Sequence, residues 1–84
     1  MFKYEFTSKS LKDLKKLDRQ VQIKIIEKLD EICSHSDIRN YAEHLTDYKI
    51  GEFRIRIGDY RVIFDLKEKT LTILKIGHRK DIYR

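Results

Sequence analysis

The twelve-residue stretch FRIRIGDYRVIF, residues 53–64, constrains the fold of this chain more than any other segment. Apolar and basic residues alternate on both sides of its Gly-Asp pair, a pattern typical of two antiparallel strands joined by a two-residue turn. With that turn, Arg56 lies directly opposite Arg61, and Arg54 follows two residues along the same face. Like charges paired in this way destabilise a sheet by roughly 0.2–1 kcal/mol. The positive charge on this face therefore requires an explanation other than stability.

A third strand follows the hairpin and completes a meander. The predicted strands cover residues 52–57, 60–66 and 70–76, and the sequences GD and KEK supply the tight turns between them. Because both turns are short, neighbouring strands of the meander must run antiparallel.

The N-terminal half predicts one strand followed by two helices. Aromatic and charged residues alternate over residues 2–6, which indicates a first strand. Thr7 or Ser8 can cap a helix, and Asp18 can cap a second, longer one. The short break between the helices predicts an antiparallel hairpin. The apolar stripes of the two helices consist of Leu11, Leu14 and Leu17, and of Val21, Ile25, Leu29 and Ile32.

The order of these elements, β-α-α-β-β-β, predicts the fold class. Residues 34–46 are mostly polar and are predicted to form a connection, packed by Ile38, Tyr41 and Leu45. We expect an α+β domain with an antiparallel sheet and the helical hairpin packed on one face. Proline, low-complexity tracts and internal repeats are absent from the sequence, so residues 1–84 are predicted to form a single domain.

The composition indicates which kinds of binding partner and which cellular compartment to expect. The 84 residues include 19 Lys and Arg against 14 Asp and Glu, a formal net charge of +5, which favours a polyanion or an acidic protein as partner. The single cysteine, Cys33, excludes an intramolecular disulfide and is consistent with a reducing compartment. The N-terminal segment has no long apolar run, so we expect neither a signal peptide nor a membrane span, and a cytoplasmic location.

The arginines of the hairpin are expected on the sheet face that the helices leave open. Alternation sends Arg54, Arg56 and Arg61 to that face, and Asp65 is the only obvious acid to offset them. A solvated strand face is the simpler explanation of such charges. Three arginines in place of lysines favour phosphate binding, because the guanidinium group binds phosphate through two parallel hydrogen bonds and stays charged.

The sequences GDYRVIF and GHRKDIY, together with TSKSLKDLKKLD, resemble the RelE branch of the RelE/ParE toxin superfamily. The resemblance extends over nearly the whole chain. It implies a microbial RNase-like fold and a toxin of a type II toxin–antitoxin system, which cleaves mRNA on the ribosome without a metal or other cofactor. The implied partners are a RelB-like antitoxin, the ribosome and mRNA.

The same resemblance assigns roles by position. Arg54 and Arg56 match a basic pair on the second strand, and Arg61 matches an arginine on the third. After the last strand, Arg79 matches an arginine of the family, and Tyr83 matches a tyrosine in the C-terminal tail that is implicated in catalysis. The implied catalytic residues are Arg56, Arg61, Arg79, Tyr83 and, as an additional titratable group, His78; the implied RNA-binding residues are Lys49, Arg54 and Lys80.

The chemistry of metal-independent RNA cleavage needs these residue types. The 2′-OH attacks the adjacent phosphate, so the reaction requires a base, cations around the phosphorane and an acid for the leaving oxygen. Tyr83 is a candidate base or a stacking platform for a nucleobase. An ordinary phenol titrates near ~10, so a tyrosine base needs neighbouring cations. His78 can serve as acid or base, or it is a surface histidine.

Other functions stay open on the sequence. One alternative is a ParE-like DNA gyrase inhibitor without catalysis, and another is a catalytically inactive nucleic-acid-binding module. Cys33, His35 and His44 match no standard zinc-ligand spacing, and Cys33 fits better as a core residue. Tyr48 is predicted to be a core or boundary aromatic that can also touch RNA next to Lys49.

Overall fold

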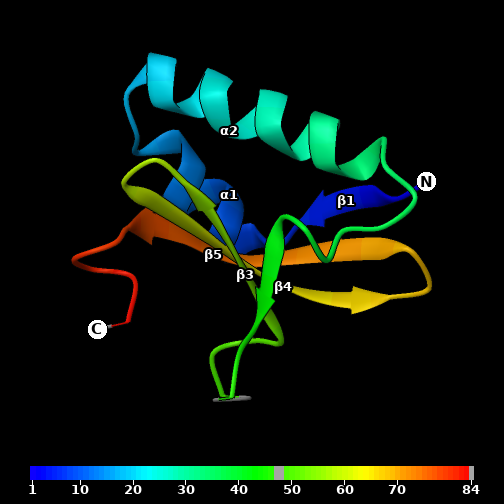
Figure 1. Ribbon diagram of the computed structural model, residues 1–84. Helices are drawn as coiled ribbons and strands as arrows, with labels where there is room; N and C mark the ends of the chain where they lie inside the picture. The colour runs from blue at the N-terminus through cyan, green and yellow to red at the C-terminus, as the bar shows by residue number, and fades with distance from the viewer. Residues whose placement is uncertain (47–48, 84) are drawn as a thin grey trace.

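Five strands and two helices make up residues 1–46 and 49–83, the part of the chain that the computed structural model describes (Figure 1). The elements are β1 (Lys3–Phe6), α1 (Ser8–Lys15), α2 (Arg19–Cys33), β2 (Ala42–His44), β3 (Phe53–Ile57), β4 (Tyr60–Lys67) and β5 (Thr70–His78). The α+β class, the two helices after the first strand and the final three-strand meander are all confirmed.

The strands form one sheet in the order β1-β5-β4-β3-β2. The meander β3-β4-β5 is antiparallel, but β1 runs parallel to β5, with Tyr4 beside Leu71 and Phe6 beside Ile73. The sheet is therefore mixed, whereas the sequence suggested an antiparallel one. Turn lengths fix the direction of consecutive strands only, and β1 and β5 are far apart in the chain.

Strand β2 lies inside the segment that was predicted to be a connection. It pairs antiparallel with β3, placing Ala42 opposite Ile55 and Glu43 opposite Arg54. Its three residues include alanine and glutamate, which are depleted in strands, so local propensity gives no signal for it. The predicted packing of this segment holds for Ile38, which is buried in the core.

The two helices are fixed to the sheet by polar contacts as well as by packing. Thr7 caps α1, since its hydroxyl accepts the Ser10 N–H at 3.1 Å. The Asp13 carboxylate on α1 accepts the Ile76 N–H of β5 at 3.1 Å. Asp18 occupies the predicted N-cap position of α2, but its side chain makes no capping hydrogen bond. Helix α2 crosses the sheet above β1 and β3, and α1 lies against β5 (Figure 1).

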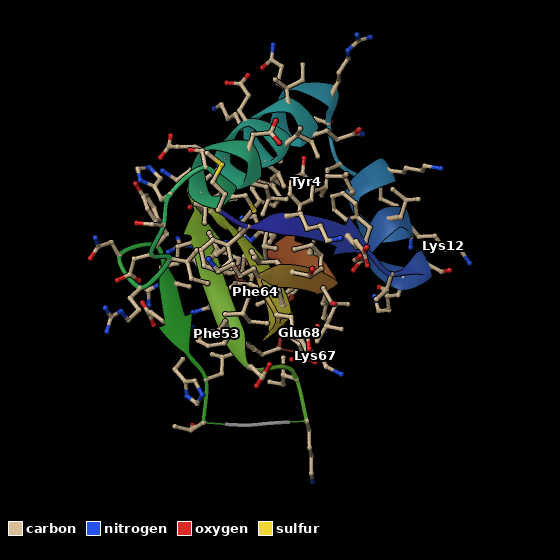
Figure 2. The ribbon with its side chains drawn as sticks, turned by 90° about the vertical axis from the view of Figure 1, so that its right-hand side faces the viewer. Tyr4, Lys12, Phe53, Phe64, Lys67 and Glu68 are labelled. Carbon is tan, nitrogen blue, oxygen red and sulfur yellow. The ribbon has the colours of Figure 1, made fainter. Side chains whose placement is uncertain are left out.

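The core lies between the helices and one face of the sheet. Figure 2 shows Phe53 and Phe64 side by side on neighbouring strands, where their rings stack with centroids 5.3 Å apart. Cys33 is buried in this core, in agreement with its interpretation as a packing residue. The other buried members of the cluster are Leu14, Ile25, Leu29, Ile32, Ile38, Ile55, Val62, Leu71, Ile73 and Ile76.

The opposite face is partly covered, which corrects the expectation of an open surface. Ile63 and Ile82 are both fully buried there, outside the main core. Gly51 lies so close to Ile63 that a Cβ atom on the glycine would stand 2.6 Å from its Cγ2 atom. Gly77 leaves room for Ile82, whose Cδ1 atom would be 3.3 Å from a Cβ at that position. The loop before β3 thus covers Ile63, where Gly51, Ile63 and Leu74 form a small cluster, and the C-terminal turn separately packs Ile82 on Gly77.

Neither helix, in the part of the chain that the structure describes, combines the length and the apolar character that crossing a membrane requires.

Candidate active site

The β3–β4 hairpin places three arginines on the sheet face away from the helices. Arg56 pairs with Arg61 across the hairpin, as predicted, and Arg54 pairs with Ile63 two positions further along. Ile55, between the two arginines of β3, is buried in the main core. Side chains alternate along a strand, so the three arginines share the opposite face.

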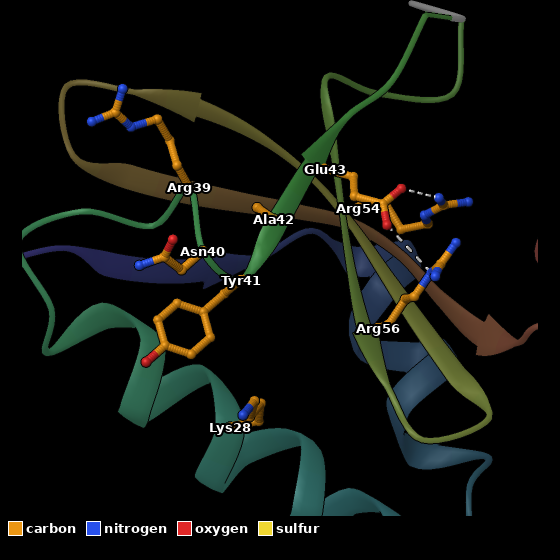
Figure 3. A pocket seen from close by; sticks show the side chains of 8 residues that line it. All are labelled: Lys28, Arg39, Asn40, Tyr41, Ala42, Glu43, Arg54 and Arg56. Carbon is orange, nitrogen blue, oxygen red and sulfur yellow. Dashed lines mark hydrogen bonds and ion pairs between the residues drawn. The ribbon is translucent and has the colours of Figure 1, made fainter.

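Arg54 connects strand β3 to β2 and to the C-terminal turn. Its side chain is only 18% exposed. Nη1 donates a hydrogen bond to the Tyr83 hydroxyl at 2.6 Å, and Nη2 donates to the Glu43 carboxylate (Figure 3). The hydrogen bond with Tyr83, opposed by burial and reinforced by Glu43, raises the pKa of Arg54. Arg54, which is predicted to bind RNA, contacts Tyr83 and Glu43 through these bonds and holds both in place.

Glu43 is the acidic member of the cluster, and the sequence analysis missed it. Its carboxylate lies between Arg54 and Arg56, with Oε1 3.5 Å from Nε of Arg56. The hydrogen bond from Arg54, followed by the charges of Arg54, Arg56 and Arg61, lowers the pKa of Glu43. Asp65, the acid that we expected in this role, instead accepts the Glu52 N–H at 2.9 Å. The sequence did contain a signal for Glu43, namely an acidic residue that precedes the arginine-rich strand β3.

Arg61 is held at the turn of the same hairpin. Its Nη1 donates to the backbone carbonyls of Gly58 at 2.8 Å and Tyr60 at 2.9 Å. These bonds fix the guanidinium group beside the turn at the hairpin end of the arginine cluster. They also offset part of the repulsion from Arg56, because partial negative charge on two carbonyl oxygens faces the cation.

Arg79 also reaches this turn, but through a different residue. Its backbone N–H donates to the Asp59 carbonyl at 2.7 Å, and its Nε lies 3.6 Å from the Asp59 carboxylate. The side chain is 57% exposed. Arg79 and Tyr83 therefore have different partners.

The C-terminal turn brings Tyr83 to the arginines. The N–H groups of Asp81 and Ile82 both donate to the His78 carbonyl, which closes a single tight turn after β5. Ile82 is 1% exposed and anchors that turn on the sheet. Tyr83 is 46% exposed, and its ring centroid lies 5.9 Å from the guanidinium carbon of Arg54. The short tail thus places a phenol next to the cationic cluster.

His78 lies away from the other predicted catalytic residues. It pairs with Tyr60, and the two rings meet edge to face with centroids 5.5 Å apart. Val62 and Ile76 form the next pair on the same face of the sheet, and both are buried under the helices. Side chains alternate along a strand, so His78 lies on the helix side of the sheet, whereas Arg61 lies on the other face. Its Nδ1 accepts the Lys80 N–H at 3.1 Å, which leaves Nε2 as the site of the proton in the neutral ring.

The remaining predicted residues lie at the margins. Lys80 is exposed in the C-terminal turn, and Lys49 is exposed in the loop before β3. Tyr48 lies outside the described residues. No group of three or more His, Cys, Asp or Glu that could hold a metal ion occurs within residues 1–46 and 49–83.

A groove of about 350 Å³ runs beside the arginines, between α2 and the β2–β3 edge of the sheet (Figure 3). Arg54 and Arg56 form one side of it, and Lys28 of α2 forms part of the other. Lys28 lies 5.3 Å from the centroid of the Tyr41 ring, which also lines the groove. The volume and the basic residues of the walls suit a nucleotide-sized anionic group, and the Glu43 carboxylate also lines the groove.

Fold and site together define a class of small basic domains, in which two helices cover one face of a five-stranded sheet and arginines occupy the other. The sequence matches the family described as the ParE toxin of the type II toxin–antitoxin system parDE over residues 4–83, and the chain belongs to this family within the RelE/ParE superfamily.

Individual relatives belong to the RelE branch. Toxin RelG of Mycobacterium tuberculosis (strain ATCC 25618 / H37Rv) is 31% identical over 81 residues, which cover 94% of this chain and 92% of RelG. The toxin–antitoxin complex RelBE2 of M. tuberculosis matches with a TM-score of 0.80 and 25% identity, covering 93% of this chain and 98% of that one. The isolated E. coli RelE toxin shares the fold, with a TM-score of 0.71 and 21% identity over 99% and 92% of the two chains. This chain is a type II toxin of the RelE branch.

Proposed function

We propose that this toxin is a ribosome-dependent mRNA endoribonuclease that inhibits translation in the cytoplasm. The observation that carries the proposal is the 2.6 Å hydrogen bond between Arg54 and the exposed phenol of Tyr83, beside Arg56 and Arg61. Cleavage of RNA needs cations for a phosphate and a group that transfers a proton, and this cluster offers both.

In the proposed reaction the 2′-oxygen of a nucleotide attacks its own 3′-phosphate. The proton of the 2′-OH passes to a base, the P–O5′ bond breaks, and the leaving 5′-oxygen takes a proton from an acid. The products are a 2′,3′-cyclic phosphate and a free 5′-OH. Arg56 and Arg61 stabilise the negative charge of the phosphorane, so positive charge comes from guanidinium groups and the step needs no metal.

Tyr83 is the proton-transfer group that the geometry favours. Its hydroxyl oxygen accepts a hydrogen bond from the Arg54 guanidinium group, which holds the phenol beside the arginines that would bind the phosphate. His78 is less suited, because its ring lies against Tyr60 on the other side of the sheet. Arg79, at the Asp59 turn, is positioned to bind a neighbouring phosphate of the substrate.

An antitoxin is the expected protein partner. Solved relatives include RelB–RelE complexes from Methanococcus jannaschii and Pyrococcus horikoshii OT3. A RelB-like antitoxin with acidic segments suits the net charge of +5. Its affinity should fall as salt concentration rises, to the extent that exposed charges contribute.

The decisive assay adds the purified protein to ribosomes programmed with mRNA and maps new 5′-OH ends. We expect cleavage within the ribosome-bound segment, and Tyr83→Phe should slow the single-turnover rate by roughly 10²-fold with unchanged ribosome affinity. A gyrase supercoiling assay on the same preparation tests the ParE-like alternative. Inhibition of gyrase without mRNA cleavage would replace the proposal, and intact RNA with unaffected gyrase would indicate a binding module.

A further inference from the structure

Strand β2 places a carboxylate inside the arginine cluster, in the position of an anionic ligand. Glu43 pairs with Arg54 across the strands and accepts a hydrogen bond from its Nη2 atom. The other carboxylate oxygen lies 3.5 Å from Nε of Arg56 (Figure 3). A carboxylate that bridges two guanidinium groups uses the donors that would bind two oxygens of a phosphodiester.

We propose that Glu43 is an internal competitor for the phosphate site, which a substrate phosphate must displace from Arg56 before it can bind. The identity of the ligand as RNA rests on the proposed function, whereas competition for an anion site rests on the contacts of Glu43 alone.

The two contacts of Glu43 differ in strength, and this difference determines how the displacement occurs. The Arg54 side chain is 18% exposed and also donates a hydrogen bond to Tyr83. These two restraints fix the guanidinium group, so its contact with Glu43 is the stronger one. Arg56 is 57% exposed, and its separation from Glu43 is at the long end for an ion pair. A phosphate can therefore take Arg56 while Glu43 stays bound to Arg54.

Protonation does not relieve this competition near neutral pH. The hydrogen bond from Arg54 and the charges of Arg54, Arg56 and Arg61 lower the pKa of Glu43, so the carboxylate stays ionised. Only another anion, delivered at a high local concentration, can replace it.

The consequence is selectivity for RNA that is already held in place. A phosphate on free RNA must outcompete a carboxylate that is tethered next to Arg56 and therefore present at high effective concentration. RNA fixed on the ribosome has its own effective concentration and can displace Glu43 with binding energy from contacts elsewhere. Glu43 would thus make the toxin weak toward free RNA.

The test compares wild-type protein with Glu43→Gln, which keeps the shape and removes the charge. The probe is a fluorescent single-stranded RNA with 2′-O-methyl groups throughout, which cannot be cleaved, and anisotropy gives the Kd over a series of KCl concentrations. We expect Glu43→Gln to bind roughly 1.5-fold to fivefold more tightly at low salt, the range for an exposed ion pair. The slope of log K against log salt should steepen by about 0.7, for one additional phosphate contact.

Two controls separate local competition from a general gain in charge. Glu27→Gln, on the exposed side of α2, changes the net charge equally and should leave the affinity nearly unchanged. In an Arg56→Gln background, Glu43→Gln should lose most of its gain, because the arginine that it frees is missing. Thermal unfolding of each variant confirms that the compared proteins are folded.

Equal or weaker binding by folded Glu43→Gln would overturn the proposal, and so would an undiminished gain in the Arg56→Gln background. Because the probe cannot be cleaved, the result does not depend on catalysis. A wild-type protein that fails to cut mRNA on ribosomes would remove the proposed function and leave this test intact.

Discussion

The two faces of strand β4 differ in what they contribute to the protein. Val62 and Phe64 point into the main core under the helices and are fully buried. Between them, Ile63 points to the other face, where it is equally buried, lies against Gly51 of the loop before β3 and pairs with Arg54 and Lys75 on the neighbouring strands. One face thus has a large apolar core, and the other has a small apolar base beneath a cationic site. Burial alone does not distinguish a core residue from one that supports the site.

The comparison predicts that stability and activity can be changed separately. Substitutions on the helix side should change unfolding and leave the chemistry of folded molecules intact. Substitutions among the arginines should do the opposite. Substitutions in the small cluster around Ile63 should affect both.

The largest expected effect comes from the helix side. Phe64→Ala removes a fully buried ring that stacks on Phe53 and leaves a cavity, so the free energy of unfolding should fall by about 3–5 kcal/mol. Urea denaturation followed by circular dichroism measures the change. A loss below about 1 kcal/mol would mean that the core refills the cavity, contrary to the packing described above.

Arg61→Ala should separate activity from stability on the other face. The hydrogen bonds that Arg61 donates to the turn are lost, but repulsion from Arg56 is relieved, so stability should change by less than about 1 kcal/mol. Single-turnover cleavage on programmed ribosomes should slow by roughly 10²-fold or more. Lys67→Ala removes an equal charge from the same strand and serves as control. Wild-type cleavage rates in folded Arg61→Ala protein would exclude this arginine from the mechanism.

A pair of glycine variants tests the small cluster. Gly51 and Gly58 both have positive φ angles, 151° and 59°, so an alanine at either position costs about 1–3 kcal/mol in backbone strain, with the larger cost at Gly51. At Gly51 the new Cβ would also stand 2.6 Å from Ile63, whereas nothing lies within 4 Å at Gly58. Gly51→Ala should therefore destabilise the protein by about 1–3 kcal/mol more than Gly58→Ala in urea titrations. Equal losses for the two variants would show that the loop does not pack on Ile63.

The smallest effect is a pH dependence on the helix side. The Tyr4 hydroxyl donates to Asp30 at 2.8 Å, and burial, followed by this hydrogen bond, raises the pKa of Tyr4 from 10.0 to about 12. Between these values the folded protein keeps a proton that the unfolded chain has released, so stability falls as pH rises through this window. Urea midpoints at about pH 9 and pH 11 should show a smaller decline for Tyr4→Phe than for wild type. Parallel declines would indicate that this hydrogen bond does not hold the proton.

The sequence predicted the parts of the site that lie close together along the chain. The alternation in residues 53–64 and the Gly-Asp turn were sufficient to place Arg56 opposite Arg61. Strand β2 could not be predicted in the same way, because its pairing with β3 and not its own composition makes it a strand. The counterion Glu43 was missed for that reason.

Contacts between segments that are distant in the chain also could not be predicted from the sequence. Tyr83 meets Arg54, 29 residues earlier, only because Ile82 fits over Gly77, and no periodic pattern records that fit. The position of His78 follows from its pairing with Tyr60, one residue before Arg61, so a longer predicted strand would have placed it correctly. Residue identity gave the candidates, and strand register decided which of them meet.

The position of β5 between β1 and β4 has a consequence for the order of events during synthesis. Residues 3–6 are made early, but their partners are residues 70–73, so the first strand stays unpaired until most of the chain exists. Pairing across such a sequence distance is slow, because closing a long loop costs conformational entropy before the contacts between the two strands form. Gly77 and Ile82, which hold Tyr83 in place, come later still. A nascent chain therefore cannot assemble the arginine–tyrosine site early, and the site forms only after the ribosome has made nearly all of the domain.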